Sequence, residues 1–117
     1  LAVAAGYGQA RVTSITANIN FPFTVEGKVL PAGEYKFVRT DSGSAFIVES
    51  GVRHVATALV LTRLSRAMHT TPEDSHIVFD KVGDTYTLAE IWAPNEDGFV
   101  LAMTKTPHEH HVVNVRK

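Results

Sequence analysis

Apolar and polar residues alternate with a period of two along most of the chain. The clearest instance covers residues 15–25, where apolar side chains take every second position and Thr and Asn take most positions between them. Successive side chains of a β-strand point to opposite faces of a sheet, so this pattern predicts a half-buried strand. Pro22 cannot donate a ladder hydrogen bond, and it therefore marks an edge position, a bulge or a break between two strands.

The same pattern predicts two hairpins farther along the chain. Their strands and turns are 34–40 and 45–49 around residues 41–44, and 76–81 and 85–93 around residues 82–84. In the second hairpin Tyr86, Leu88 and Trp92 are expected to anchor the strands, in the core or across the strand pair. Before the first hairpin, residues 26–28 and 29–33 carry turn signals and are expected to reverse the chain twice.

Residues 52–65 form an ambiguous segment, since their apolar positions also fit one face of a helix. A strand is favoured because the segment is rich in β-branched Val and Thr and because turn signals recur about every ten residues. Residues 67–75 are polar and contain proline, which predicts a surface loop. The segments 99–104 and 110–115 are expected to be the last strands, with Pro107 marking the break between them.

These segments add up to eight or nine short strands in a chain of 117 residues. A single flat sheet of that size would leave an apolar face in water. The sequence therefore predicts an all-β fold, a single-domain antiparallel β-sandwich or small β-barrel, over residues 11–117. The content of 44% apolar and 20% charged residues is typical of a compact globular domain.

The residue usage argues against several classes of function. Eleven Lys and Arg stand against twelve Asp and Glu, and no basic run is present that could follow a phosphate backbone, so nucleic acid is not an expected partner. The absence of Cys removes disulfides and thiolate chemistry. No stretch approaches the roughly 20 apolar residues of a membrane span. No Gly-x-Ser-x-Gly elbow or phosphate-binding glycine loop is present, so an enzyme is not expected.

The segment Leu1–Ala10 consists mostly of small and apolar residues and ends in Gly8-Gln9-Ala10. A small-x-small sequence after an apolar stretch is typical of a signal-peptide cleavage site. We therefore expect a secreted, extracytoplasmic protein of the periplasm or the cell surface. Residues 1–10 are then either the remnant of a signal peptide or an apolar N-terminal arm.

An arm that survives processing could add a strand to the sheet edge of a neighbouring molecule. Leu1, Val3 and Tyr7 are its candidate self-association residues. The expected partners are further copies of this chain, in a homo-oligomer or an extracellular filament, or other envelope proteins. A cleaved remnant or a frayed tail is the alternative.

Three of the six histidines lie within His108–His111. Histidines at positions i and i+2 of a strand point to the same side and can bind one Zn²⁺ or Cu²⁺, with a His or Asp from elsewhere completing the site. The candidate ligands are His108, His110 and His111. Further donors could be His54, His69 or His76. The alternative is a solvated polar segment that binds metal only incidentally.

Two groups of motifs cover most of the chain. One joins Phe-Pro-Phe-x-Val at Phe21–Val25 to Leu-Pro-Ala-Gly-Glu-Tyr at Leu30–Tyr35, and the other is Val-Phe-x-Lys-x-Gly-Asp-x-Tyr-x-Leu-x-Glu-x-Trp at Val78–Trp92. In these motifs the chain resembles small, exported, functionally uncharacterised bacterial all-β proteins. The resemblance implies an all-β fold and an exported location, and it carries no catalytic residues. The His108-x-His110 pair also resembles the metal sites of cupins, although the glutamate that follows in those sites is absent here.

Two functions from different classes follow from the sequence. The leading hypothesis is a non-enzymatic structural or interaction domain outside the cytoplasm that self-associates by terminal-strand donation into a filament or surface polymer. The alternative is a secreted β-domain that binds copper, zinc or a small ligand through the histidine cluster.

Overall fold

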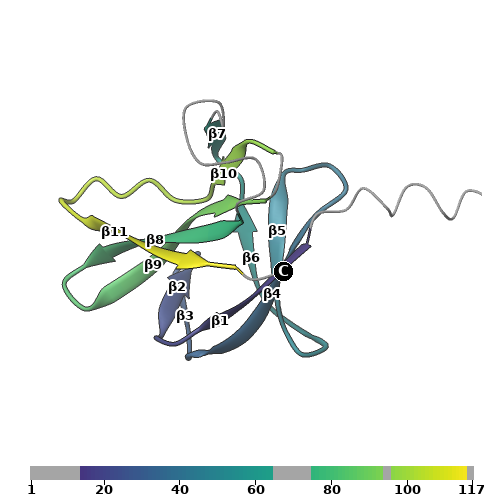
Figure 1. Cartoon of the computed structure of the whole chain (residues 1–117), viewed down its shortest axis with the longest axis horizontal. Helices are drawn as coiled ribbons and strands as arrows, with labels where there is room; N and C mark the ends of the chain where they lie inside the picture. The colour runs from purple at the N-terminus through teal and green to yellow at the C-terminus, as the bar shows by residue number, and fades with distance from the viewer. Residues whose placement is uncertain (1–13, 65–74, 94–95, 116–117) are drawn as a thin grey trace, which may run out of the picture.

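The computed structural model describes residues 14–64, 75–93 and 96–115 (Figure 1). These ranges are all-β, as predicted. Their strands are β1 (Ser14–Ile19), β2 (Phe23–Val25), β3 (Lys28–Leu30), β4 (Gly33–Arg39), β5 (Ala45–Ser50), β6 (Arg53–Leu59), β7 (Thr62–Leu64), β8 (His76–Val82), β9 (Thr85–Trp92), β10 (Gly98–Val100) and β11 (Glu109–Asn114). Within the same ranges, no helix has the length and apolarity that a membrane span requires.

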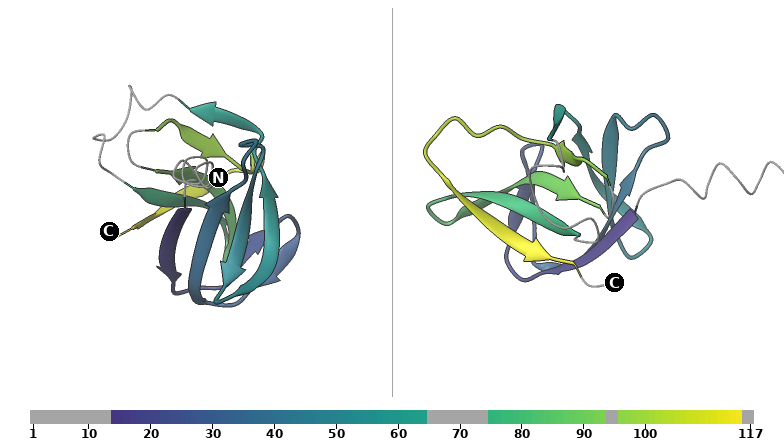
Figure 2. Two further views of the ribbon diagram at one scale, coloured as in Figure 1. Left: turned by 90° about the vertical axis from the view of Figure 1, so that its right-hand side faces the viewer. Right: turned by 45° about the horizontal axis from the view of Figure 1, so that its top comes forward.

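The strands form two sheets (Figure 2). One sheet has the order β1-β4-β5-β6 and is antiparallel throughout. The other follows the path β11-β8-β9-β10-β7 and is also antiparallel, with the β2–β3 hairpin attached through a parallel bridge between β2 and β9. The two predicted hairpins are therefore confirmed as β4–β5 and β8–β9.

The core lies between the two sheets and draws on both of them. Strand β1 buries Ile15, Ala17 and Ile19 and exposes the residues between, as its alternation predicts. The largest fully buried side chains are phenylalanines from both sheets, namely Phe23, Phe37, Phe46, Phe79 and Phe99. Since one cluster contains residues of both sheets, burying it holds the two sheets together.

The first of the two expected reversals is a tight turn at Glu26 and Gly27, within the predicted residues 26–28. Both residues have positive φ, 50° and 80°, and they form the two-residue loop of the β2–β3 hairpin. The tip of this hairpin reaches the edge of β6, where Glu26 Oε2 accepts a hydrogen bond from the Leu59 amide at 3.1 Å. Lys28 Nζ donates to the Val55 carbonyl at 2.8 Å. These side chains occupy backbone groups that an edge strand would otherwise present to another chain.

The predicted turn at residues 31–33 is fastened by the tyrosine that follows it. Tyr35 is buried, and its hydroxyl donates a hydrogen bond to the Pro31 carbonyl at 2.6 Å. Burial raises the pKa of the Tyr35 phenol above its usual value, because the phenolate would lose its hydration. The neutral phenol therefore donates the hydrogen bond that fixes the turn before β4.

Three segments differ from the expected strand pattern. Of the predicted segment 52–65, residues 53–59 and 62–64 are strands rather than a helix, as favoured, and they form the separate strands β6 and β7. Pro22 separates β1 from β2, which is one of the outcomes that its chemistry allowed. The prediction of a strand over residues 99–104 was wrong in length, because β10 ends at Val100 and residues 101–108 pair with no strand. The division into β6 and β7, together with β3, which lies where a bend over residues 29–33 was expected, raises the strand number in the described ranges to eleven.

A β-bulge explains where β10 ends. The register of β8 and β9 shifts between Val78 and Phe79, which pair with Glu90 and Leu88 and leave Ala89 as an extra residue in β9. The Ala89 carbonyl then accepts a hydrogen bond from the Leu101 amide at 2.7 Å. Beyond this bond the chain leaves the sheet and runs along the β8–β9 hairpin toward its tip, before β11 returns beside β8 (Figure 1).

Candidate metal centre

Strand β11 lies antiparallel to β8 in a register that sets His110 directly opposite Asp80. Directly paired residues of neighbouring strands point to the same face of a sheet. On β8 the side chains of Ile77 and Phe79 point into the core and are fully buried, so Asp80 belongs to the outer face. The pairing therefore brings a carboxylate of β8 and an imidazole of β11 together on that face.

His108 joins this pair from the residue before β11. Its Nε2 lies 3.5 Å from Asp80 Oδ1, and the Nε2 of His110 lies 3.6 Å from the same oxygen. One ligand atom from each of these residues lies within 4.8 Å of the others. We call this group the Asp–His–His cluster. As predicted, His108 and His110 lie on the same side of the chain.

A second hydrogen bond sets which nitrogen of His108 faces the cluster. The Nδ1 of His108 lies 2.8 Å from the Thr106 carbonyl, which can only accept, so Nδ1 carries the proton. Nε2 is then the nitrogen of the ring that faces Asp80. Metal-binding histidines usually show this arrangement, in which one nitrogen donates to a carbonyl and the other binds the ion.

The spacing of the cluster fits a metal site, and it also lies within the range of an ion pair between Asp80 and a protonated histidine. Hydrogen bonds between nitrogen and oxygen measure about 2.7–3.2 Å, which is shorter than both Asp80–histidine distances. Ligand atoms about 2.0–2.1 Å from one tetrahedral centre stand about 3.3–3.4 Å apart. The separations of 3.5 and 3.6 Å therefore fit two edges of such a tetrahedron, and the ligand nitrogens of the two histidines lie within 4.8 Å of each other.

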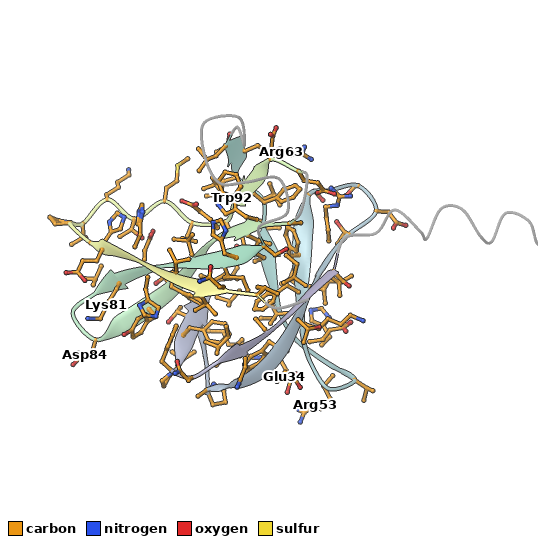
Figure 3. The ribbon with its side chains drawn as sticks, viewed as in Figure 1. Glu34, Arg53, Arg63, Lys81, Asp84 and Trp92 are labelled. Carbon is orange, nitrogen blue, oxygen red and sulfur yellow. The ribbon has the colours of Figure 1, made fainter. Side chains whose placement is uncertain are left out.

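The burial of Asp80 and the charges around it favour a bound cation. Its side chain is only 5% exposed, and no lysine or arginine of the described ranges forms an ion pair with it. The neighbouring Lys81 lies over the Tyr86 ring, 5.9 Å from the centroid, because successive residues of a strand face opposite sides. Figure 3 shows Lys81 and Asp84 near the tip of the hairpin. A buried carboxylate without such a partner favours a bound cation.

A cavity of about 280 Å³ opens beside the cluster. All three cluster residues line it, together with residues of β7, β9, β10 and the segment that follows β10. His108 and His110 are 21% and 57% exposed, so the imidazoles form the solvent side of the cluster and Asp80 forms its floor. An ion can therefore enter from solvent.

The third predicted ligand, His111, lies apart from the cluster. It points to the opposite face of β11, where its ring contacts those of Phe21 and Tyr86 at centroid distances of 5.1 and 5.4 Å. The proposed additional donors lie elsewhere as well. The His54 side chain forms a hydrogen bond with the Thr57 hydroxyl on β6, and the His76 ring stacks on that of Trp92. His69 and the arm residues Leu1, Val3 and Tyr7 lie outside the described residues.

Sequence reasoning expected a His or Asp to complete the site but did not identify Asp80. The residue stands in the alternation of His76, Val78 and Asp80 and has the pattern of a solvent-facing position in a hairpin. Its burial arises only because β11 and the segment before it lie against this part of β8. The available signal in the sequence was a carboxylate that directly follows the apolar residues 77–79 of the predicted strand.

Comparison of the chain with protein-family models, with curated proteins and with solved structures gives no match. The similarity to small exported bacterial β-proteins therefore stays a prediction. The functional argument rests on the residues of this chain and their geometry.

Proposed function

We propose that the protein is a non-enzymatic, extracytoplasmic β-domain that binds one Zn²⁺ ion through Asp80, His108 and His110. The observation that carries the proposal is the gathering of these three ligand atoms within 4.8 Å of one another around a buried carboxylate that no lysine or arginine of the described ranges pairs with. Carboxylate oxygen and imidazole nitrogen are ordinary zinc ligands.

The ligand spacing favours zinc over copper(II). Copper(II) prefers square or tetragonal coordination, in which neighbouring ligand atoms at similar bond lengths stand about 2.8 Å apart. The observed 3.5 and 3.6 Å are closer to the tetrahedral value, so copper(II) would require the two histidines to move inward. Copper(II) binds many nitrogen sites more tightly than zinc does, and it is therefore the competitor to measure.

The fold and location that accompany this function are a β-sandwich and export. A sandwich is supported because, among the described residues, no strand pairing joins the β1-β4-β5-β6 sheet to the other sheet. Export is supported by the apolar segment Leu1–Ala10. The cluster lies on the outer face of its sheet, away from the phenylalanine core, so the domain should fold without metal.

Calorimetric titration with Zn²⁺ and Cu²⁺ tests the proposal. The wild-type chain should bind one Zn²⁺, and the double variant His108→Ala/His110→Ala should lose the binding by at least about 100-fold, since even indirect partners of a metal site are worth roughly 10–100-fold. His111→Ala is the matched control, because it removes a histidine of the same segment that faces the other side. Equal zinc affinity in the double variant and the wild type would refute the site.

The structure also supports self-association as a second function. Strand β1 is the outer strand of its sheet, and β4 is its only partner among the described residues. The opposite edge, β6, is occupied by Glu26 and Lys28, so β1 is the edge of this sheet that a donated strand could join. A cavity of about 340 Å³ lies between β1 and the end of β11. Residues 1–10 of a second copy are the proposed occupant.

Light scattering after size-exclusion chromatography tests this second function. The wild-type chain is expected to form assemblies whose size grows with concentration, because each copy offers one arm and one free edge. Deletion of residues 1–10 should leave monomers, and replacing Leu1, Val3 and Tyr7 by serine should do the same while keeping the length of the arm. A monomeric wild-type chain, or assembly that survives both changes, would refute strand donation.

A further inference from the structure

The cavity beside the Asp–His–His cluster extends from the metal centre over the outer face of the seven-stranded sheet. Apart from the cluster, Glu90 and two threonines, Thr62 and Thr104, its lining is apolar and comes from Leu64, Val100, Ala102 and Met103. Met103 is 63% exposed and lies at the mouth, on the segment between β10 and β11. A metal at one end and apolar side chains along the wall make a surface with two chemically different halves.

One charged side chain, Glu90, also lines this cavity. Its Oε1 accepts a hydrogen bond from the indole Nε1 of Trp92 at 2.9 Å, and this bond fixes the carboxylate. The indole itself lies toward β10 (Figure 3). Glu90 pairs with Val78 across the strands, two residues along β8 from Asp80, so its negative charge sits beyond the metal centre within the same cavity.

Three protein ligands leave one corner of a tetrahedral ion for a water molecule or an external ligand. Asp80 closes the cluster from below, and the two histidines approach from the β11 side. All three residues line the cavity, so an ion that they hold is exposed to it. The fourth corner is therefore available to a molecule lying on the apolar wall.

We propose that this corner binds the carboxylate of a small organic acid with a short apolar chain, an inference that rests on the proposed zinc site. The cation attracts the carboxylate, and the apolar wall contacts the chain. The cavity of about 280 Å³ is open on its solvent side and offers space beside the ion for the short chain of a small ligand. Glu90 repels a second negative charge, which makes a monocarboxylate a better ligand than a dicarboxylate.

Cobalt(II) in place of zinc makes the ligand visible, because its absorption spectrum changes when a ligand replaces water. The Co²⁺-loaded protein is titrated with acetate, butyrate and succinate. Each buried methylene contributes up to roughly fourfold in affinity, so butyrate should bind about tenfold more tightly than acetate. Succinate should bind more weakly than butyrate, since its second carboxylate meets the apolar wall and Glu90.

Two variants separate the contribution of the cavity from that of the metal. Ala102→Phe fills part of the wall and should weaken butyrate about tenfold, while the affinities for Co²⁺ and for acetate stay as in the wild type. Glu90→Gln keeps an oxygen for the Trp92 indole and removes the charge, so succinate should gain severalfold and butyrate should not change. Equal affinities for acetate and butyrate, or no response to either variant, would overturn the inference.

The outcomes distinguish this inference from the zinc proposal. If the protein fails to bind Co²⁺ and Zn²⁺, the metal site itself is wrong. If both ions bind but no carboxylate alters the Co²⁺ spectrum, the site is a closed or water-filled one and only the ligand assignment fails.

Discussion

Replacing Asp80 by asparagine is expected to weaken Zn²⁺ binding by at least about 100-fold without destabilising the metal-free domain. The amide has nearly the shape of the carboxylate but no charge, and Asp80 provides the only anionic ligand of the cluster. Without metal, the buried carboxylate faces two imidazoles at distances longer than hydrogen bonds. Removing that charge relieves a desolvation cost, so the free energy of unfolding should stay equal or rise.

Calorimetry and urea denaturation at about pH 8, where a free imidazole is neutral, measure the two effects. Asp84→Asn is the matched control, because Asp84 lies near the tip of the same hairpin outside the cluster (Figure 3). Full zinc affinity in Asp80→Asn would show that the two histidines bind the ion alone. A large loss of stability in the metal-free variant would show that Asp80 is a structural ion-pair partner instead.

Replacing Phe79 by alanine is expected to lower the free energy of unfolding by about 3–5 kcal/mol. The Phe79 ring is fully buried and packs edge-on against Phe21 and Phe23, with centroids 5.0 and 5.4 Å away. Its removal leaves a cavity where β8, β2 and the segment between β1 and β2 meet. Urea denaturation of the metal-free protein measures the change.

Val112→Ala on β11 serves as the control for this substitution. Val112 is 50% exposed, so its truncation should cost less than about 1 kcal/mol. Zinc should raise the midpoint of unfolding of the Phe79→Ala variant if the folded form still binds, because a ligand of the native state stabilises it by mass action. A loss no larger than that of Val112→Ala would mean that the core does not depend on this ring.

The sequence predicts the strands of this fold better than it predicts their arrangement. Period-two alternation identifies β1, and turn residues identify the β4–β5 and β8–β9 hairpins, because both signals are local. The length of β10 depends on the Ala89 bulge and on the bond from Leu101, which join residues distant in sequence. No local pattern contains that information.

The candidate site divides in the same way. Period-two alternation predicts that His108 and His110 share one side, and both face Asp80 although His108 lies just before β11. The same alternation places His111 among aromatic rings on the other side. It was predicted as a ligand only because it is adjacent to His110 in the sequence. Identifying Asp80 as a ligand depends on the pairing of β11 with β8. These strands are far apart in the chain, and a single sequence does not reveal their pairing.

The cluster residues come from two distant positions in the sequence, so a bound zinc ion would close a loop of the chain. Asp80 stands at the start of that loop and His108 at its end, so a bound ion would cross-link the chain around residues 81–107. The loop contains β9, β10 and the unpaired segment with Met103, which supply much of the cavity wall. Closing a loop removes conformational entropy from the open states of the chain. The ion that binds the ligand would thereby also hold together the wall on which the ligand rests.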